Sequence, residues 1–133
     1  MRHGLDTSVV IRLLVGEPEE QAAKAACWIE TCKLEGLAPT VSDLVIAESY
    51  FALQTHYGVS KREAIEALLG MLESGDVISS GRALDVLRTV PNLAVAKPGF
   101  VDRLIHSEIV SGGSTMLTFE KAAGKLNQVK VIA

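Results

Sequence analysis

Short apolar segments alternate with longer helical patterns along the whole chain, and this alternation limits the folds that it can form. The short segments lie at 2–5, 37–41, 77–78, 114–117 and 129–132. Strands that alternate with helices are typical of a parallel sheet whose faces are covered by helices. The sequence therefore predicts an α/β fold in which four to five short parallel strands are flanked by helices.

Helix start and stop signals divide the remaining sequence. We expect helices from 6–8 to 16, from 18 to about 34, from 43 to about 56, from 60 to 75, from 80 to 90, from 100 to 112 and from 119 to 126. Ser42 can cap the third helix, and Ser60 with Glu63 has the capping-box spacing at the start of the fourth. Only the turn 57–59 separates these two helices, which predicts an αα-hairpin inserted between strands.

Size and composition indicate a single domain over residues 1–133. The chain has 133 residues, of which 48% are hydrophobic, and this is enough apolar surface for one core. Cys27 and Cys32 are five apart on one predicted helix, so a disulfide is not expected. No signal peptide or membrane-spanning run is visible, and we therefore expect a cytoplasmic protein with no membrane contact.

The net charge of −3 does not indicate the basic surface with which proteins bind nucleic acid by neutralising its phosphates. A metal ion held by several carboxylates can nevertheless face phosphates and supply the missing positive charge. A nucleic-acid substrate is therefore compatible with this charge.

Acidic residues follow two of the predicted strands. Asp6 separates the first strand from the first helix, and Glu120 has the same position after the fourth strand. Ligands of open α/β sheets bind beyond the carboxyl ends of the strands, so both acids would face one crevice if these strands are neighbours. With Glu48 and Asp102, they form a predicted cluster of four acids that holds a divalent metal.

Each strand-end acid also has a purely structural explanation. Asp6 is at a helix start, where Asp is a favoured N-cap. Asp102 is also at the start of a predicted helix, so it too could act as a cap rather than as a metal ligand. Thr118 can cap the last helix, which would make Glu120 a first-turn acid. Geometry has to decide between these alternatives.

Glu48 is the most informative of the four acids. Its neighbours three and four positions away on the predicted helix are all apolar: Leu44, Val45, Phe51 and Ala52. A carboxylate inside an apolar stripe is costly to bury without a partner, which favours a functional role. The alternative is a partly buried face from which Glu48 forms a salt bridge outward.

Other chemistries find less support. His3, His56 and His106 share no metal-ligand spacing, Ser8 and Ser42 lack a catalytic His and Asp arrangement, and no Gly-rich phosphate loop is present. The pattern favours carboxylate and metal chemistry.

Four short motifs resemble those of PIN-domain ribonucleases, and among them the VapC-type toxins of bacterial and archaeal toxin–antitoxin pairs. The motifs are Leu5-Asp6-Thr7-Ser8, Ser42 followed by Glu48, Val101-Asp102-Arg103-Leu104-Ile105 and Leu117-Thr118-Phe119-Glu120. Their order and spacing extend the resemblance over nearly the whole length. It implies a single PIN-like domain, a homodimer and endonucleolytic cleavage of RNA, inhibited by a small antitoxin that covers the active-site groove.

The resemblance also implies roles for individual residues. Asp6 and Asp102 would be the main ligands of Mg²⁺ or Mn²⁺, Glu48 would complete or orient the metal shell, and Glu120 would be the fourth acid. Thr7, Ser8 and Thr118 would position water or a phosphate oxygen. Basic residues that could contact RNA are Arg12, Lys61, Arg62, Arg103 and Lys121.

The chain departs from the family pattern at two positions. Glu120 stands where the family usually has Asp after a Thr, and its longer side chain shifts the carboxylate, which affects a second metal more than the first. Arg103 replaces a residue that is often small. A PIN-like domain that binds RNA or protein without turnover is therefore an alternative function.

A receiver-like phospho-accepting regulator is a further alternative. That class requires an additional acidic pair beside the first strand, and residues 1–4 leave no room for it. An apolar partner surface is expected on the 27–34 helix or on the 42–72 hairpin.

Overall fold

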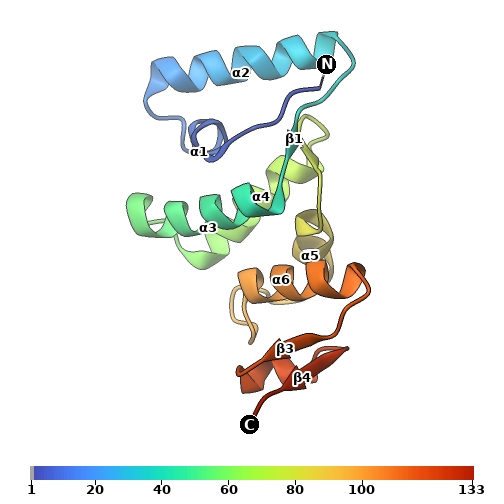
Figure 1. The fold of residues 1–133 in the computed structure, drawn as a ribbon. Coiled ribbons are helices and arrows are strands. Elements are labelled where there is room, and N and C mark those ends of the chain that lie inside the picture. Colours follow the sequence, from blue (N-terminus) through green and yellow to red (C-terminus); the bar gives the residue numbers. More distant parts are fainter. Residues whose placement is uncertain (1) are drawn as a thin grey trace.

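The protein is elongated, with helices at one end and short strands at the other (Figure 1). The structure is a computed structural model that describes residues 2–133. Helices α1 (Thr7–Val15) and α2 (Glu19–Leu34) lie at the N-terminal end, and strands β3 (Met116–Thr118) and β4 (Val129–Val131) at the C-terminal end. The prediction of an α/β chain is confirmed, although helices dominate it.

The first two helices follow their sequence signals. Val10 and Ile11 turn the apolar face of α1 into the core. Gly16 ends this helix with φ 79°, a left-handed conformation that glycine adopts without a steric penalty, and its N–H donates to the Arg12 carbonyl at 2.9 Å. Helix α2 starts with Glu19 and Glu20, whose charges favour a helix N-terminus.

The predicted αα-hairpin is confirmed by α3 (Asp43–Tyr57) and α4 (Lys61–Glu73). The Ser42 hydroxyl accepts a hydrogen bond from the Val45 amide at 3.3 Å and caps α3. At the start of α4, the Glu63 amide donates to Ser60 Oγ at 3.1 Å, and the Ser60 amide donates to Glu63 Oε1 at 3.2 Å. Both hydrogen bonds of the predicted capping box are therefore present.

The strands form two small parallel sheets, which corrects the prediction of one sheet with four to five strands. Strand β1 (Thr40–Val41) pairs with β2 (Ile78–Ser79), and β3 pairs with β4. The predicted first strand at 2–5 contributes only an isolated bridge between Gly4 and Thr40, and β3 does not pair with it. Strands of two or three residues form few ladder hydrogen bonds, so helix packing determines the arrangement instead.

Two predicted helices are shorter in the structure. Helix α5 (Ala83–Thr89) starts three residues later than expected. Helix α6 (Phe100–Ser111), which comes next, starts at the expected residue. The predicted helix at 119–126 is a short 3₁₀ helix, η1 (Lys121–Lys125). Gly124 within this segment disfavours a regular helix, because glycine loses more backbone entropy on ordering than other residues.

The hydrophobic core is built by the helices. Its most buried large side chains include Val10, Ile46, Leu68 and Phe100, and the main cluster of buried residues ends at Leu104. The β3–β4 unit, defined as residues 114–132, packs separately below α6 with Met116 and Ala123 buried. No helix among residues 2–133 is long and apolar enough to cross a membrane.

Candidate acidic site

Asp6 caps helix α1. Its Oδ1 accepts hydrogen bonds from the Ser8 hydroxyl at 2.6 Å and from the Val9 amide at 3.2 Å. These donors, the Ser8 hydroxyl foremost, hold the pKa of the Asp6 carboxyl below its usual range. The capping explanation of Asp6 is thus correct for the local structure. The carboxylate also stays ionised at neutral pH, as a metal ligand must.

Thr7 links the start of α1 to the middle of α3. Its hydroxyl donates a hydrogen bond to Oε1 of Glu48, 41 residues further along the chain. Thr7 thereby holds Glu48 against the start of α1, next to Asp6 in the sequence, and we call these two acids the Asp6–Glu48 pair. Thr7 and Ser8, predicted to position water or phosphate, each have a carboxylate as their partner in this structure.

Glu48 lies on an exposed face of α3, which corrects the expectation of a buried apolar stripe. Its helical neighbours Leu44 and Phe51 are 78% and 52% exposed. Helix α3 is apolar around most of its circumference, and the side that enters the core carries Ile46, Ser49, Tyr50 and Leu53. Glu48 is thus an exposed acid between exposed apolar side chains, with Thr7 as its partner rather than an outward salt bridge.

Asp102 belongs to the first turn of α6 but does not cap it. The N-cap position is Gly99, which has no side chain to cap the helix. The Asp102 side chain is exposed and forms no hydrogen bond or ion pair with the other residues between 2 and 133. Asp102 lines two cavities, one between α6 and α3 and one between α6 and the β3–β4 unit. Asp102 is therefore available to a ligand on either side of α6.

Glu120 lines the second of these cavities together with Asp102. This cavity has a volume of about 350 Å³ and lies between α6, β3 and η1. The Thr118 hydroxyl accepts a hydrogen bond from the Glu120 amide at 3.0 Å, so Thr118 orders the turn instead of facing solvent freely. Asp102 and Glu120 form the second acidic group, called the Asp102–Glu120 pair.

The structure does not bring all four acids together. Within residues 2–133, no three His, Cys, Asp or Glu side chains are gathered closely enough to hold a metal ion. The separation follows from the sheets, because β3, which ends two residues before Glu120, pairs with β4 and not with the segment before Asp6. The four-acid metal cluster stays a prediction, and the structure shows two acidic pairs.

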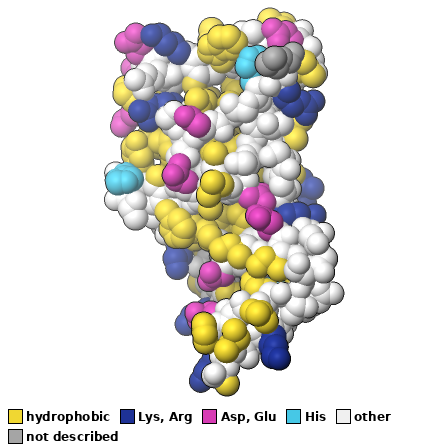
Figure 2. Space-filling view, viewed as in Figure 1, with side chains coloured by type: hydrophobic (Ala, Val, Ile, Leu, Met, Phe, Trp, Pro, Cys, Tyr) yellow, Lys and Arg dark blue, Asp and Glu magenta, His cyan; other side chains and the backbone are white. Residues whose placement is uncertain are grey.

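Hydrophobic side chains surround these acids. Figure 2 shows them gathered over the face between α3 and α6, with acidic side chains among them. Exposed apolar residues on these elements and on β3 include Leu44, Phe51, Ile105 and Leu117. The hairpin surface predicted to bear exposed apolar area is thus confirmed as exposed at Leu44 and Phe51.

The predicted basic residues differ in their availability. Arg12 Nε donates to Gln21 Oε1 at 2.6 Å, and Arg103 Nε donates to the Pro98 carbonyl at 2.7 Å. Lys61 lines the cavity between α3 and α6. Arg62 and Lys121 are exposed. Lysine rather than arginine is therefore the cation at the α3–α6 cavity.

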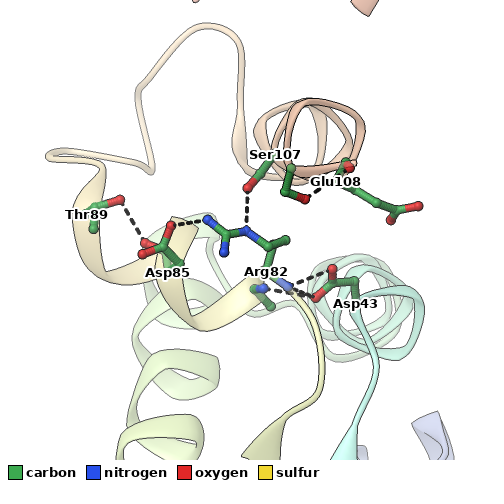
Figure 3. Close-up of polar contacts among 8 residues, drawn as sticks. Asp43, Arg82, Asp85, Thr89, Ser107 and Glu108 are labelled. Carbon is green, nitrogen blue, oxygen red and sulfur yellow. Dashed lines mark hydrogen bonds and ion pairs between the residues drawn. The ribbon is translucent and has the colours of Figure 1, made fainter. Parts of the chain in front are cut away.

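Asp43 is an acid that the sequence patterns missed. Its carboxylate accepts hydrogen bonds from the Arg82 and Ala83 amides, each at 2.9 Å, and thereby caps α5 (Figure 3). A Cβ at Gly81 would overlap this carboxylate, so a larger residue there would push Asp43 away from the amides that it caps. The signal was present, since Ser42 and Asp43 are two capping residues in succession and only one of them is needed for α3.

Arg82 extends the same contacts to α6. Its Nε donates to Ser107 Oγ at 3.0 Å, and its Nη2 binds Asp85 at 2.8 Å (Figure 3). These side chains join α3, α5 and α6, which carry Glu48 and Asp102. They form a structural junction behind the acids and not a second site.

Comparisons of this chain with protein-family models, with curated proteins and with solved structures find no match.

Proposed function

We propose that this protein is a metal-dependent endoribonuclease of the PIN type that acts as the toxin of a type II toxin–antitoxin pair. The observation that carries the proposal is the hydrogen bond from Thr7 to Glu48, which joins two of the four motif positions across 41 residues. Such a contact is expected if the motifs serve one site. The exposed Asp102 carboxylate on the neighbouring helix supports the same conclusion.

The oxygen atoms of the acidic and hydroxyl side chains are of the type that binds a hard divalent cation. Carboxylate and hydroxyl oxygens are preferred ligands of Mg²⁺ and Mn²⁺. Asp6 and Asp102 would hold the ion, with Glu48 completing the shell and Glu120 at its edge, and this requires the two pairs to lie closer together than they do in this structure. Bound Mg²⁺ or Mn²⁺ would lower the pKa of a water and stabilise charge on the oxygen that leaves the phosphate.

The chain's own residues would prepare the site. The Ser8 hydroxyl keeps Asp6 ionised, and the Thr7 hydroxyl fixes the orientation of the Glu48 carboxylate. The exposed apolar side chain of Leu44 on α3 would be covered by a segment of the antitoxin or by a second copy in a homodimer.

The second candidate is a PIN-like domain that binds RNA or protein without cleaving it. The separation of the two acidic pairs favours it, because an ion held by Asp6 and Glu48 alone has an incomplete protein shell. The substitution of the usual Asp by Glu120 favours it as well.

The test is cleavage of a pool of structured RNAs with Mg²⁺, with Mn²⁺ and with a chelator. Asp6→Asn removes the charge but preserves the fold, because Asn is an equally good N-cap. We expect cleavage that requires metal and that falls by about 100-fold or more in Asp6→Asn, since even indirect partners of metal ligands contribute 10- to 100-fold.

Asp76→Asn is the matched control. Asp76 is paired with Lys33 away from both acidic pairs, so its substitution should leave cleavage unchanged. RNA binding without cleavage under any metal would favour the binding-only candidate instead.

A further inference from the structure

A cavity between α3 and the segment before α6 has no role in the proposed chemistry, although Asp102 borders it. Its volume is about 560 Å³, which is within the range of about 300–1,000 Å³ found for ligand pockets. Its lining includes Phe51, Gln54, Lys61, Val95, Lys97 and Asp102.

Phe51 presents an aromatic surface to this cavity. Its side chain is 52% exposed, while its ring packs edge-on against Tyr50 with centroids 5.4 Å apart. Tyr50 in turn packs against the fully buried Phe100 at 5.1 Å. Phe51 is therefore held by the core and still exposes ring area, which is how proteins stack unpaired nucleobases.

Two lysines add positive charge at the same cavity. Lys61 and Lys97 both line it, and neither forms an ion pair with another residue between 2 and 133. The other charged group of the lining is Asp102. In a chain of net charge −3, two unpaired cations beside an exposed aromatic ring indicate an anionic ligand with an aromatic part.

Gln54 supplies a group that can contact a base edge. Its Nε2 donates to the Tyr50 carbonyl at 3.0 Å, and this fixes the side chain beside the cavity. Its Oε1 has no hydrogen-bond partner within the described part of the chain and can accept from an exocyclic amine. Val95, another lining residue, is 70% exposed and adds apolar surface for a base.

We propose that this cavity binds one nucleotide of single-stranded RNA next to the cleavage site, with its base stacked on Phe51 and its phosphates neutralised by Lys61 and Lys97. The proposal rests on the proposed nuclease function for the nature of its ligand. It places the scissile phosphate beside Asp102, which borders the same cavity. A structured duplex does not fit this arrangement, because its bases are already stacked.

The experiment measures binding of a short fluorescent single-stranded RNA by anisotropy, in chelator so that no cleavage occurs. Phe51→Ala should weaken binding by roughly 5- to 100-fold, the usual range for loss of one base–aromatic stack. Phe51→Trp should retain it. Tyr57→Ala is the matched control, because Tyr57 is an exposed aromatic residue on the same helix that does not line this cavity.

The lysines are tested through the salt dependence. A plot of the logarithm of the RNA-binding constant against the logarithm of the salt concentration has a negative slope. Lys61→Gln and Lys97→Gln should each make this slope shallower by about 0.7, the value for one phosphate contact to a single strand. Lys24→Gln, on α2 and paired with Glu20, should leave the slope unchanged. Thermal unfolding of each variant verifies that the exposed substitutions preserve the fold.

The outcomes separate this inference from the nuclease proposal. Binding that depends on Phe51 and both lysines, in a protein that cleaves no RNA, would support the nucleotide site and contradict the nuclease. Metal-dependent cleavage with equal RNA binding by Phe51→Ala and Tyr57→Ala would overturn the nucleotide site alone. Binding that needs Phe51 but ignores salt and both lysines would also overturn it and indicate an apolar peptide as the occupant.

Discussion

The helical body and the β3–β4 unit differ in what holds each of them in place. Helices α1–α6 share one continuous core around side chains such as Leu68 and Phe100. The β3–β4 unit is attached below α6 by the buried Met116 and Ala123 and by a contact of 2.7 Å between His106 Nε2 and the Asn127 carbonyl. The acidic pairs follow this division, because the body alone holds Asp6 and Glu48 while Glu120 belongs to the unit.

The position of Glu120 is therefore less firmly determined than that of Glu48. A two-stranded sheet is marginal by itself and depends on packing against a helix. Elements with few buried contacts open at lower free energy than the core. Completion of the four-acid cluster therefore depends on the weaker of the two regions.

The largest effect is expected for a core substitution in the body. Phe100→Ala should lower the free energy of unfolding by about 3–5 kcal/mol, because it leaves a cavity at a residue that is 1% exposed. Met116→Ala in the β3–β4 unit should cost less, about 2 kcal/mol, which is the low end for a buried methionine, because Met116 already lines a cavity. Urea denaturation measures both, and equal losses would contradict the proposed difference between the regions.

The junction behind the acids should give an intermediate effect. Asp43→Ala removes the cap of α5 and should cost about 0.5–2 kcal/mol of unfolding free energy. Asp43→Asn should cost less, because Asn can still accept from the Arg82 and Ala83 amides. Denaturation of both variants tests this, and a neutral Asp43→Ala would show that the junction does not stabilise the body.

Removal of a hydroxyl beside Asp6 tests its charge state. Ser8→Ala should raise the pKa of Asp6, since the Ser8 hydroxyl is the main cause of its lowered value. A carboxyl whose pKa is lower in the folded state stabilises the native state at pH values above its unfolded pKa near 3.9, and this stabilisation is lost as the pH falls through the folded pKa. The variant should therefore lose this stabilisation at a higher pH than the wild type. Carboxyl NMR titration measures the shift, and an unchanged Asp6 pKa would exclude the Ser8 contact.

The smallest effect is expected at the exposed edge strand. Leu117 is 64% exposed on β3, so Leu117→Ser should change the free energy of unfolding by no more than about 0.5 kcal/mol. If β3 instead paired with residues 2–5 in solution, Leu117 would be buried and the loss would reach about 2 kcal/mol. Chemical denaturation of this variant therefore decides between two sheets and one.

Local signals in the sequence predicted the helices well. Ser60 with Glu63 and the glycines at 16 and 58 specify helix ends through contacts within a few residues, so the pattern alone contains the information. The αα-hairpin follows from the same signals. Asp6 as a cap was likewise visible, because capping is a local interaction.

Long-range arrangement was not readable from the pattern. The pairing of β3 depends on how α6 packs, and strands of two or three residues give no periodicity that specifies a neighbour. Glu48 was singled out because its neighbours are apolar, but two of them, Leu44 and Phe51, are exposed in the structure. An exposed apolar face and a buried one have the same sequence pattern. The Thr7 contact to Glu48 depends on tertiary structure and has no sequence signal of its own.

We propose that the two acidic pairs serve one metal site, and a Mn²⁺ titration shows whether binding depends on both of them. The titration compares wild type, Asp6→Asn and Asp102→Asn, with Asp76→Asn as the control, and follows free Mn²⁺ by electron paramagnetic resonance. We expect one Mn²⁺ site in the wild type and in the control, and we expect Asp6→Asn and Asp102→Asn each to weaken it at least tenfold. A site that survives Asp102→Asn unchanged, or no Mn²⁺ binding by the folded wild type, would contradict it.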